Sequence, residues 1–225
     1  MNTAAPNPDK RVLIVEDHPL FRAMLAQLIN QSPGMTVCGE ADNIPDAVTL
    51  IAQTMPDAAI VDLGLKGASG LELIKDLKAR QIELPVLVLS MSGERLYAER
   101  VLRAGGKGYI CKQESPEEVL IAINKVLAGG IYVSEQVNRT ILERLGKTAY
   151  SIEPSGVDLL SDREVEVYEL VGQGLNSREI GGLINLGTST VDSYRARIKG
   201  KLGIKNAAEL YQCAARWVAE RAISS

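Results

Sequence analysis

The stretch RVLIVED at residues 11–17 sets the pattern of the first half of the chain, because an apolar run ends there in two acidic residues. The pattern returns as AAIVD at residues 58–62 and as GYICK at residues 108–112, which end in Asp62 and Lys112. Runs that are apolar throughout, without polar alternation, are typical of strands buried on both faces of a parallel sheet. These three stretches therefore predict buried strands of an α/β fold.

Two further apolar runs and several helical patterns lie between these stretches. We expect five strands at residues 11–15, 35–41, 58–63, 86–90 and 108–111, and helices at residues 19–30, 45–53, 69–80 and 94–104. A fifth helix begins after Ser115, with Pro116 at its first position and Glu118 closing a capping box, and it ends at Gly129. Strand–helix alternation at this spacing predicts a five-stranded parallel sheet.

Polar side chains stand where these strands end. Glu16 and Asp17 follow the first strand, Asp62 ends the third, and Ser90 and Lys112 end the fourth and fifth. Open parallel sheets bind ligands at the carboxyl ends of their strands, so we expect these side chains to share one crevice. Clustered acids repel one another unless a cation is present, and Mg²⁺ prefers carboxylate, carbonyl and water ligands. A lysine and a hydroxyl opposite them suit a transferred phosphoryl group. The alternative is that the acids only cap the helices that follow.

These residues resemble the receiver domain of two-component response regulators, from residue 11 to about residue 130. The resemblance implies a flavodoxin-like fold. It also implies these roles: phosphoryl acceptor Asp62, Mg²⁺ ligands Glu16, Asp17, Asp62 and the backbone carbonyl of Gly64, phosphoryl-binding Lys112, and the switch residues Ser90 and Tyr109. The chain departs from the family pattern at Leu65-Lys66, where Met-Pro is frequent, and at Gln113, where Pro is commoner.

The second half of the chain shows only helical patterns. We expect a helix at residues 134–145 and a linker at residues 147–156. Four short helices follow, opened by Ser161 with Glu164 as a capping box, Asn176 or Ser177, Thr188 or Ser189, and Asn206. We therefore divide the chain into a domain at residues 1–130, a linker with one helix at 131–157, and a helical domain at 158–225.

Residues 158–217 resemble the LuxR-type helix-turn-helix of NarL/FixJ response regulators. The resemblance rests on LSDRE at residues 160–164, Gly174, SREI at 177–180, Thr190-Val191 and KLG at 201–203. Ala is usual in that family where this chain has Gly181, and Gly181 and Gly182 each cost about 1 kcal/mol in helix propensity. The resemblance implies double-stranded DNA as a partner. It also implies that the last helix, residues 207–223, joins two DNA-bound subunits; a purely internal face is the alternative.

The third of these helices is the candidate recognition helix. At about 100° per residue its larger apolar residues fall on one side, and the opposite side is small enough to sit deep in a major groove. We expect DNA contacts from Ser189, Asp192, Ser193, Ala196, Arg197 and Lys199.

The sequence leaves two interpretations of Asp192 open. It is either a capping partner of Ser189 or a carboxylate that accepts a hydrogen bond from a cytosine amino group.

Composition limits the remaining classes of protein. The net charge is −3, hydrophobic residues make up 46% of the chain, and the three cysteines are too few and too widely spaced for a disulfide framework, which suits a reducing cytoplasm. The longest strongly apolar run, residues 119–123, is far shorter than the roughly 20 residues of a membrane span, so we expect no membrane partner.

Together these features predict a cytoplasmic, DNA-binding transcriptional response regulator that is not an enzyme. We expect a sensor histidine kinase to phosphorylate Asp62 with Mg²⁺ as cofactor, and a homodimer when the protein is phosphorylated or bound to DNA. Two rival functions stay open. A small-molecule enzyme on this sheet would need a glycine-rich phosphate loop where Glu16-Asp17-His18-Pro19 stands. A helical domain that binds protein would lack the steep salt dependence of DNA binding.

Overall fold

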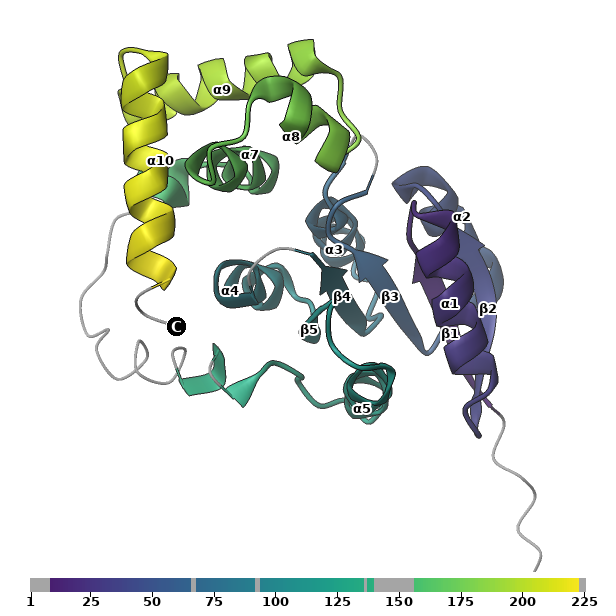
Figure 1. Cartoon of the computed structure of the whole chain (residues 1–225). Coiled ribbons are helices and arrows are strands. Elements are labelled where there is room, and N and C mark those ends of the chain that lie inside the picture. Colours follow the sequence, from purple (N-terminus) through teal and green to yellow (C-terminus); the bar gives the residue numbers. More distant parts are fainter. Residues whose placement is uncertain (1–8, 66–67, 92–93, 136, 140–155, 223–225) are drawn as a thin grey trace, which may run out of the picture. The chain divides into compact units, whose positions relative to one another are not determined.

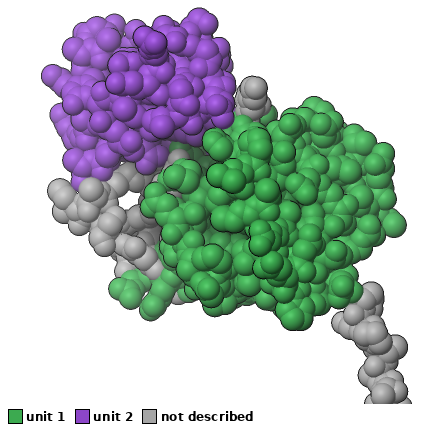
Figure 2. All heavy atoms as spheres, turned by 45° about the vertical axis from the view of Figure 1, so that its right-hand side comes forward, with its two compact units in different colours: residues 1–148 green, residues 149–225 purple. Residues whose placement is uncertain are grey.

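The computed structural model describes residues 9–65, 68–91, 94–135, 137–139 and 156–222. The chain divides into two compact units, residues 1–148 and residues 149–225, which Figure 2 shows in different colours. The domain boundaries expected from the sequence, at residues 130 and 157, stay predictions.

The first unit is built on a five-stranded parallel sheet, as the sequence predicts (Figure 1). Its strands are β1 (Lys10–Val15), β2 (Met35–Ala41), β3 (Ala58–Asp62), β4 (Val86–Ser90) and β5 (Gly108–Cys111). Their order across the sheet is β2-β1-β3-β4-β5. All residues of β3 and β4 are buried, because both faces of these strands are covered by helices. The parallel arrangement puts the carboxyl ends of all the strands at one edge.

Five helices cover the sheet: α1 (Pro19–Asn30), α2 (Ile44–Thr54), α3 (Gly70–Ala79), α4 (Glu94–Ala104) and α5 (Pro116–Leu127). Helices α1 and α5 share one face, where Leu25 and Ile123 join the same buried cluster as Ile14, Ile60 and Leu89. Helices α2, α3 and α4 pack in a row on the other face. The bounds of α1 to α4 agree with the expected ones to within one residue at each end, and α5 ends two residues before the expected Gly129.

The start of α5 corrects one sequence prediction. Ser115 caps the helix by accepting a hydrogen bond from the backbone N–H of Glu118 at 3.2 Å, as expected. The predicted return half of the capping box is wrong, because the carboxylate of Glu118 instead accepts a hydrogen bond from the hydroxyl of Tyr132. The backbone of Tyr132 also pairs with β5, accepting from the N–H of Tyr109 and donating to the carbonyl of Lys107, both at 2.9 Å. The chain after α5 is therefore tied to the edge of the sheet.

The second unit is all-helical, with a short 3₁₀ turn (Gly156–Leu159) before α7 (Asp162–Gly172), α8 (Ser177–Leu183), α9 (Thr188–Leu202) and α10 (Ala207–Ala222). Ser161 with Glu164 and Asn176 with Glu179 form complete capping boxes at α7 and α8. Gly203 ends α9 with a φ of 68°, a left-handed conformation that glycine adopts without strain. Residues 135 and 137–139 are helical. Residues 136 and 140–145 of the helix predicted at 134–145, and residues 147–155 of the linker predicted at 147–156, lie outside the described residues.

Helix α9 does not begin as predicted. Its N-cap is Gly187, with no side-chain hydrogen bond, so Thr188 and Ser189 lie inside the helix. Residues Val191 and Ile198 are fully buried, and Tyr194 and Leu202 are half-buried, so the predicted core face of the helix is confirmed. The ring of Tyr168 on α7 packs at 5.5 Å from that of Trp217 on α10 and helps to close the core of this unit.

Candidate functional site

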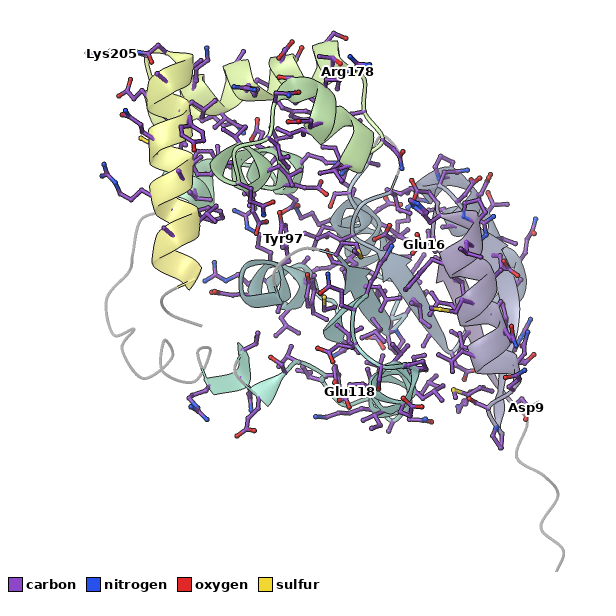
Figure 3. The ribbon with its side chains drawn as sticks, in the orientation of Figure 1. Asp9, Glu16, Tyr97, Glu118, Arg178 and Lys205 are labelled. Atoms are coloured by element: carbon purple, nitrogen blue, oxygen red, sulfur yellow. The ribbon has the colours of Figure 1, made fainter. Side chains whose placement is uncertain are left out.

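The expected strand-end residues meet at the carboxyl edge of the sheet. The Nζ atom of Lys112, just after β5, lies 2.7 Å from Oε2 of Glu16 and 3.0 Å from Oδ2 of Asp62. Glu16, labelled in Figure 3, directly follows β1, and Asp62 is the last residue of β3. Glu16 is 1% exposed and Asp62 is 6% exposed, so the lysine and both acids form a desolvated cluster. A buried cluster of this charge is held together only by mutual pairing.

Asp62 is fixed by the turn that follows it. Its Oδ1 accepts a hydrogen bond from the backbone N–H of Gly64 at 3.1 Å. A Cβ atom on Gly70 would lie 2.2 Å from the carbonyl oxygen of Asp62, so only glycine allows α3 to begin so close to the strand end. The N–H of Gly70 donates to the carbonyl of Leu63 at 2.9 Å and closes this loop. The carboxylate of Asp62 therefore sits on a tightly constrained backbone.

The acidic side of the pocket fits a divalent cation. The side chain of Asp17 is only 6% exposed. Its Oδ2 atom is buried and has no hydrogen-bond partner among the described residues. Possible ligand atoms of Glu16, Asp17 and His18 lie within 4.8 Å of one another. Burial raises the pKa of Glu16, and the charge of Asp62 raises it further, although Lys112 acts in the opposite direction. A hard cation such as Mg²⁺ would satisfy the unpartnered oxygen and the excess negative charge.

Ser90 and Tyr109 lie on the strands beside this cluster. Ser90 ends β4, is 3% exposed, and accepts a hydrogen bond through its carbonyl from the N–H of Lys112 at 2.8 Å. Tyr109, on β5, is fully buried. The structure thus brings Lys112 into direct contact with Glu16 and Asp62. Asp17 is next to Glu16 in the chain, and Ser90 ends β4, the strand between β3 and β5. The roles assigned to these residues stay predictions.

The exposed side of α9 carries the expected small residues. Ser189, Ser193 and Ala196 are exposed, and Arg197 is exposed beside them, with its guanidinium carbon 4.7 Å from the centre of the Tyr194 ring. Lys199 is half-buried. A helix whose outer side is small and flanked by cations can approach the floor and the phosphate walls of a DNA groove.

Both halves of the chain match known families. Residues 12–124 match the response regulator receiver domain, and residues 158–214 match the luxR family of bacterial regulatory proteins. The chain belongs to the LuxR family of two-component response regulators.

Relatives of this response regulator match it over nearly the whole chain. NarL, the nitrate/nitrite response regulator of Escherichia coli, is 30% identical over 212 residues, which cover 94% of this chain and 96% of NarL. NarP from the same species is 30% identical over 196 residues, covering 87% of this chain and 90% of NarP. RcsB from Salmonella enterica serovar Typhimurium, solved bound to the promoter rprA with the phosphomimetic BeF₃⁻, shares 26% identity and a TM-score of 0.58, with 92% of this chain and 98% of RcsB covered.

The family membership makes this protein a DNA-binding transcriptional regulator of the two-component type. No helix in the described part of the chain is long and apolar enough to cross a bilayer.

Sequence reasoning missed two residues of the receiver pocket. The ring of Phe21 lies 4.7 Å from Nζ of Lys112, so the ammonium group contacts an aromatic face as well as two carboxylates. Arg22 donates a hydrogen bond to the backbone carbonyl of Glu16 at 2.6 Å and lies 3.4 Å from Glu40, which holds the end of β1 to α1 and β2. The available signal is position, since Phe21 and Arg22 lie in the first turn of α1, directly after the acids that end β1.

The structure overturns the capping interpretation of Asp192. This residue lies beyond the first turn of α9, and its Oδ1 accepts a hydrogen bond from the hydroxyl of Ser177 at 2.6 Å. Ser189 uses its backbone carbonyl to accept from the hydroxyl of Ser193 at 2.9 Å. Asp192 therefore joins α9 to α8, a contact that no local spacing rule predicts.

Proposed function

We propose that this response regulator is switched by transfer of a phosphoryl group from a sensor histidine kinase to Asp62. The observation that carries this proposal is the contact of Lys112 with both Asp62 and Glu16 in a desolvated pocket. An ammonium group in that position opposes the charge that accumulates on a transferred phosphoryl group. If the acids only capped the helices that follow, a buried lysine in contact with both carboxylates would not be needed.

In the proposed transfer, the P–N bond of the kinase phosphohistidine breaks and a P–O bond forms on the carboxylate of Asp62. Residues Glu16, Asp17 and Asp62, with the carbonyl of Gly64, would hold Mg²⁺. When bound, the ion neutralises phosphoryl oxygens and orients the group for in-line transfer. Lys112 then pairs with the new phosphoryl oxygens, and the hydroxyl of Ser90 and the ring of Tyr109 respond to it.

Labelling by acetyl phosphate tests the acceptor. Asp62→Asn should abolish Mg²⁺-dependent labelling, because the amide oxygen is a far weaker nucleophile than the carboxylate. The control is Asp76→Asn, which removes the charge of a partly exposed acid on α3 and should leave labelling unchanged. Stoichiometric labelling of the Asp62→Asn protein at another acid would refute the assignment.

We also propose that α9 meets double-stranded DNA with the side of the helix that carries Ser189, Asp192, Ser193, Ala196, Arg197 and Lys199. The exposed small residues and the adjacent cations support this orientation. DNA affinity falls as salt rises, and the steepness is the slope of log affinity against log salt. Arg197→Ala and Lys199→Ala should each make this slope less steep by about 1 if the side chain contacts a phosphate. The control is Arg216→Ala, an exposed cation on α10 outside this face. Unchanged slopes in both α9 variants would show that these charges only face solvent.

The proposal also covers the protein's location and its oligomeric state. The protein works in the cytoplasm, and it forms a homodimer when phosphorylated or bound to DNA. Light scattering of the full chain with and without beryllofluoride tests the second point. A doubling of mass that requires Asp62 is the expected result, and an unchanged monomer in the presence of saturating DNA would refute it.

A further inference from the structure

Ser177, Asp192 and Arg195 are linked by two consecutive hydrogen bonds between α8 and α9, here called the α8–α9 circuit. The hydroxyl of Ser177, the first residue of α8, donates to Oδ1 of Asp192 at 2.6 Å and accepts from a terminal nitrogen of Arg195 at 3.0 Å. A hydroxyl has a single proton and two lone pairs, and an ionised carboxylate only accepts, so the direction of both bonds is fixed. The circuit therefore runs from Arg195 through Ser177 to Asp192.

Arg195 is oriented by this circuit but not neutralised in it. Among the described residues its only side-chain hydrogen bond is the one to Ser177, and no carboxylate lies within ion-pair distance of it. A guanidinium carries several N–H donors in a rigid plane, so most of them stay available. Asp192 lies three residues earlier on the same helix, yet its carboxylate points to Ser177 and not directly to the guanidinium.

The position of Ser177 indicates which part of DNA this arginine meets. In a helix-turn-helix the first helix of the motif crosses the sugar–phosphate backbone, while the second enters the groove. Ser177 opens that first helix, and the next residue, Arg178, is exposed and labelled in Figure 3. A guanidinium anchored to Ser177 therefore lies on the backbone side of α9 and not above the small residues of its groove side.

We propose that Asp192 is a positioning residue: through the hydroxyl of Ser177 it fixes Arg195 to receive a phosphate of the DNA backbone, and it does not itself read a base. This role presupposes that α9 is the DNA-binding helix. Holding a long side chain in its bound geometry before association reduces the entropy lost on binding.

The experiment is a salt titration of DNA affinity for the full chain, using fluorescence anisotropy with an operator duplex selected from genomic DNA. Arg195→Ala should lower the salt slope by about 1. Ser177→Ala and Asp192→Ala should lower affinity several-fold with a reduced slope, and Ser177→Thr, which keeps the hydroxyl, should restore both. The double variant Ser177→Ala/Arg195→Ala should bind no more weakly than Arg195→Ala alone, because the serine acts only through the arginine.

Three results would overturn the proposal. The first is an unchanged slope for Arg195→Ala while Arg197→Ala lowers it, which keeps α9 on DNA but removes Arg195 from the phosphate. The second is a double variant, Ser177→Ala/Arg195→Ala, whose loss of binding free energy equals the sum of the losses in the two single variants. The third is a relaxed base position for Asp192→Ala in a randomised-site selection, which would make Asp192 a base reader. If instead neither Arg197→Ala nor Lys199→Ala changes the slope, the failure lies with the proposed DNA face itself. Melting temperatures of all variants separate loss of folding from loss of contact.

Discussion

Asp17 keeps a buried carboxylate oxygen without a hydrogen-bond partner, beside a glutamate whose pKa is raised by burial. Such a group destabilises the protein unless a cation or a proton compensates it. Asp17→Asn should therefore raise the melting temperature of the protein in EDTA by a few degrees, corresponding to about 1 kcal/mol. The same change should abolish the further rise that Mg²⁺ produces in the unmodified protein. Calorimetry with EDTA and with MgCl₂ measures both effects.

The control for this prediction is Asp76→Asn, whose acid forms an exposed ion pair with Arg80 at 2.8 Å. Surface pairs of this kind contribute about 0–1 kcal/mol, so neither melting curve should move appreciably. A Mg²⁺-dependent rise that survives in Asp17→Asn would exclude Asp17 from the cation site.

At the scale of an element, α8 contains two glycines with opposite surroundings. A Cβ on Gly182 would meet nothing within 4 Å, whereas a Cβ on Gly181 would lie 2.4 Å from the carbonyl oxygen of Leu186. Gly182→Ala should raise the stability of the helical unit by up to about 1 kcal/mol through helix propensity. Gly181→Ala should lower it, because the turn between α8 and α9 must move. Thermal melts followed by the fluorescence of Trp217, the sole tryptophan, report on this unit; equal shifts in the two variants would contradict the prediction.

The pairing of α7 with α9 makes the helical unit sensitive to acid. Glu164 is 2% exposed, and it accepts hydrogen bonds from Lys201 at 2.6 Å and from the N–H of Ser161 at 2.7 Å. Desolvation acts to raise the pKa of Glu164, but these hydrogen bonds outweigh it and hold the pKa below its usual value of 4.5. The stabilisation is therefore present above pH 4.5 and is lost as pH falls through the lower, folded-state pKa.

Glu164→Gln should remove this dependence. We expect the variant to be less stable than the unmodified protein at pH 7 by about 1–3 kcal/mol, the cost of weakening a buried charged hydrogen bond. The difference should shrink as pH falls below 4.5. Tryptophan-monitored urea unfolding across the pH range measures it, and a constant difference at every pH would show that Glu164 contributes through packing alone.

At the scale of the whole molecule, phosphorylation and DNA binding are expected to be coupled, and such coupling must be reciprocal. If beryllofluoride raises the affinity for operator DNA by some factor, then operator DNA must raise the affinity for beryllofluoride by the same factor. Titrations in both directions on the full chain test this equality. Asp62→Asn should abolish the effect in both, because the acceptor carboxylate is the shared requirement. A DNA effect in one direction only would refute thermodynamic coupling.

The sequence by itself determined the order of strands and helices, the parallel sheet and the meeting of Glu16, Asp62 and Lys112. These features follow from local periodicity, since a parallel sheet brings every strand's carboxyl end to one edge whatever the connecting helices contain. Cap residues such as Ser161 and Asn176 were predictable for the same reason, because each acts within a few residues of itself.

Only the tertiary structure decided the contacts between elements. The carboxylate of Glu118 accepts a hydrogen bond from Tyr132 and does not cap its own helix. The ring of Phe21 contacts the ammonium group of Lys112. Asp192 accepts a hydrogen bond from Ser177 and does not pair with Ser189 as the predicted cap of α9. Glu118 and Asp192 each had a plausible local capping partner in the sequence. Packing then brought a partner from a distant part of the chain within reach, and a polar or charged group binds the partner that packing orients best, which need not be the one nearest in sequence.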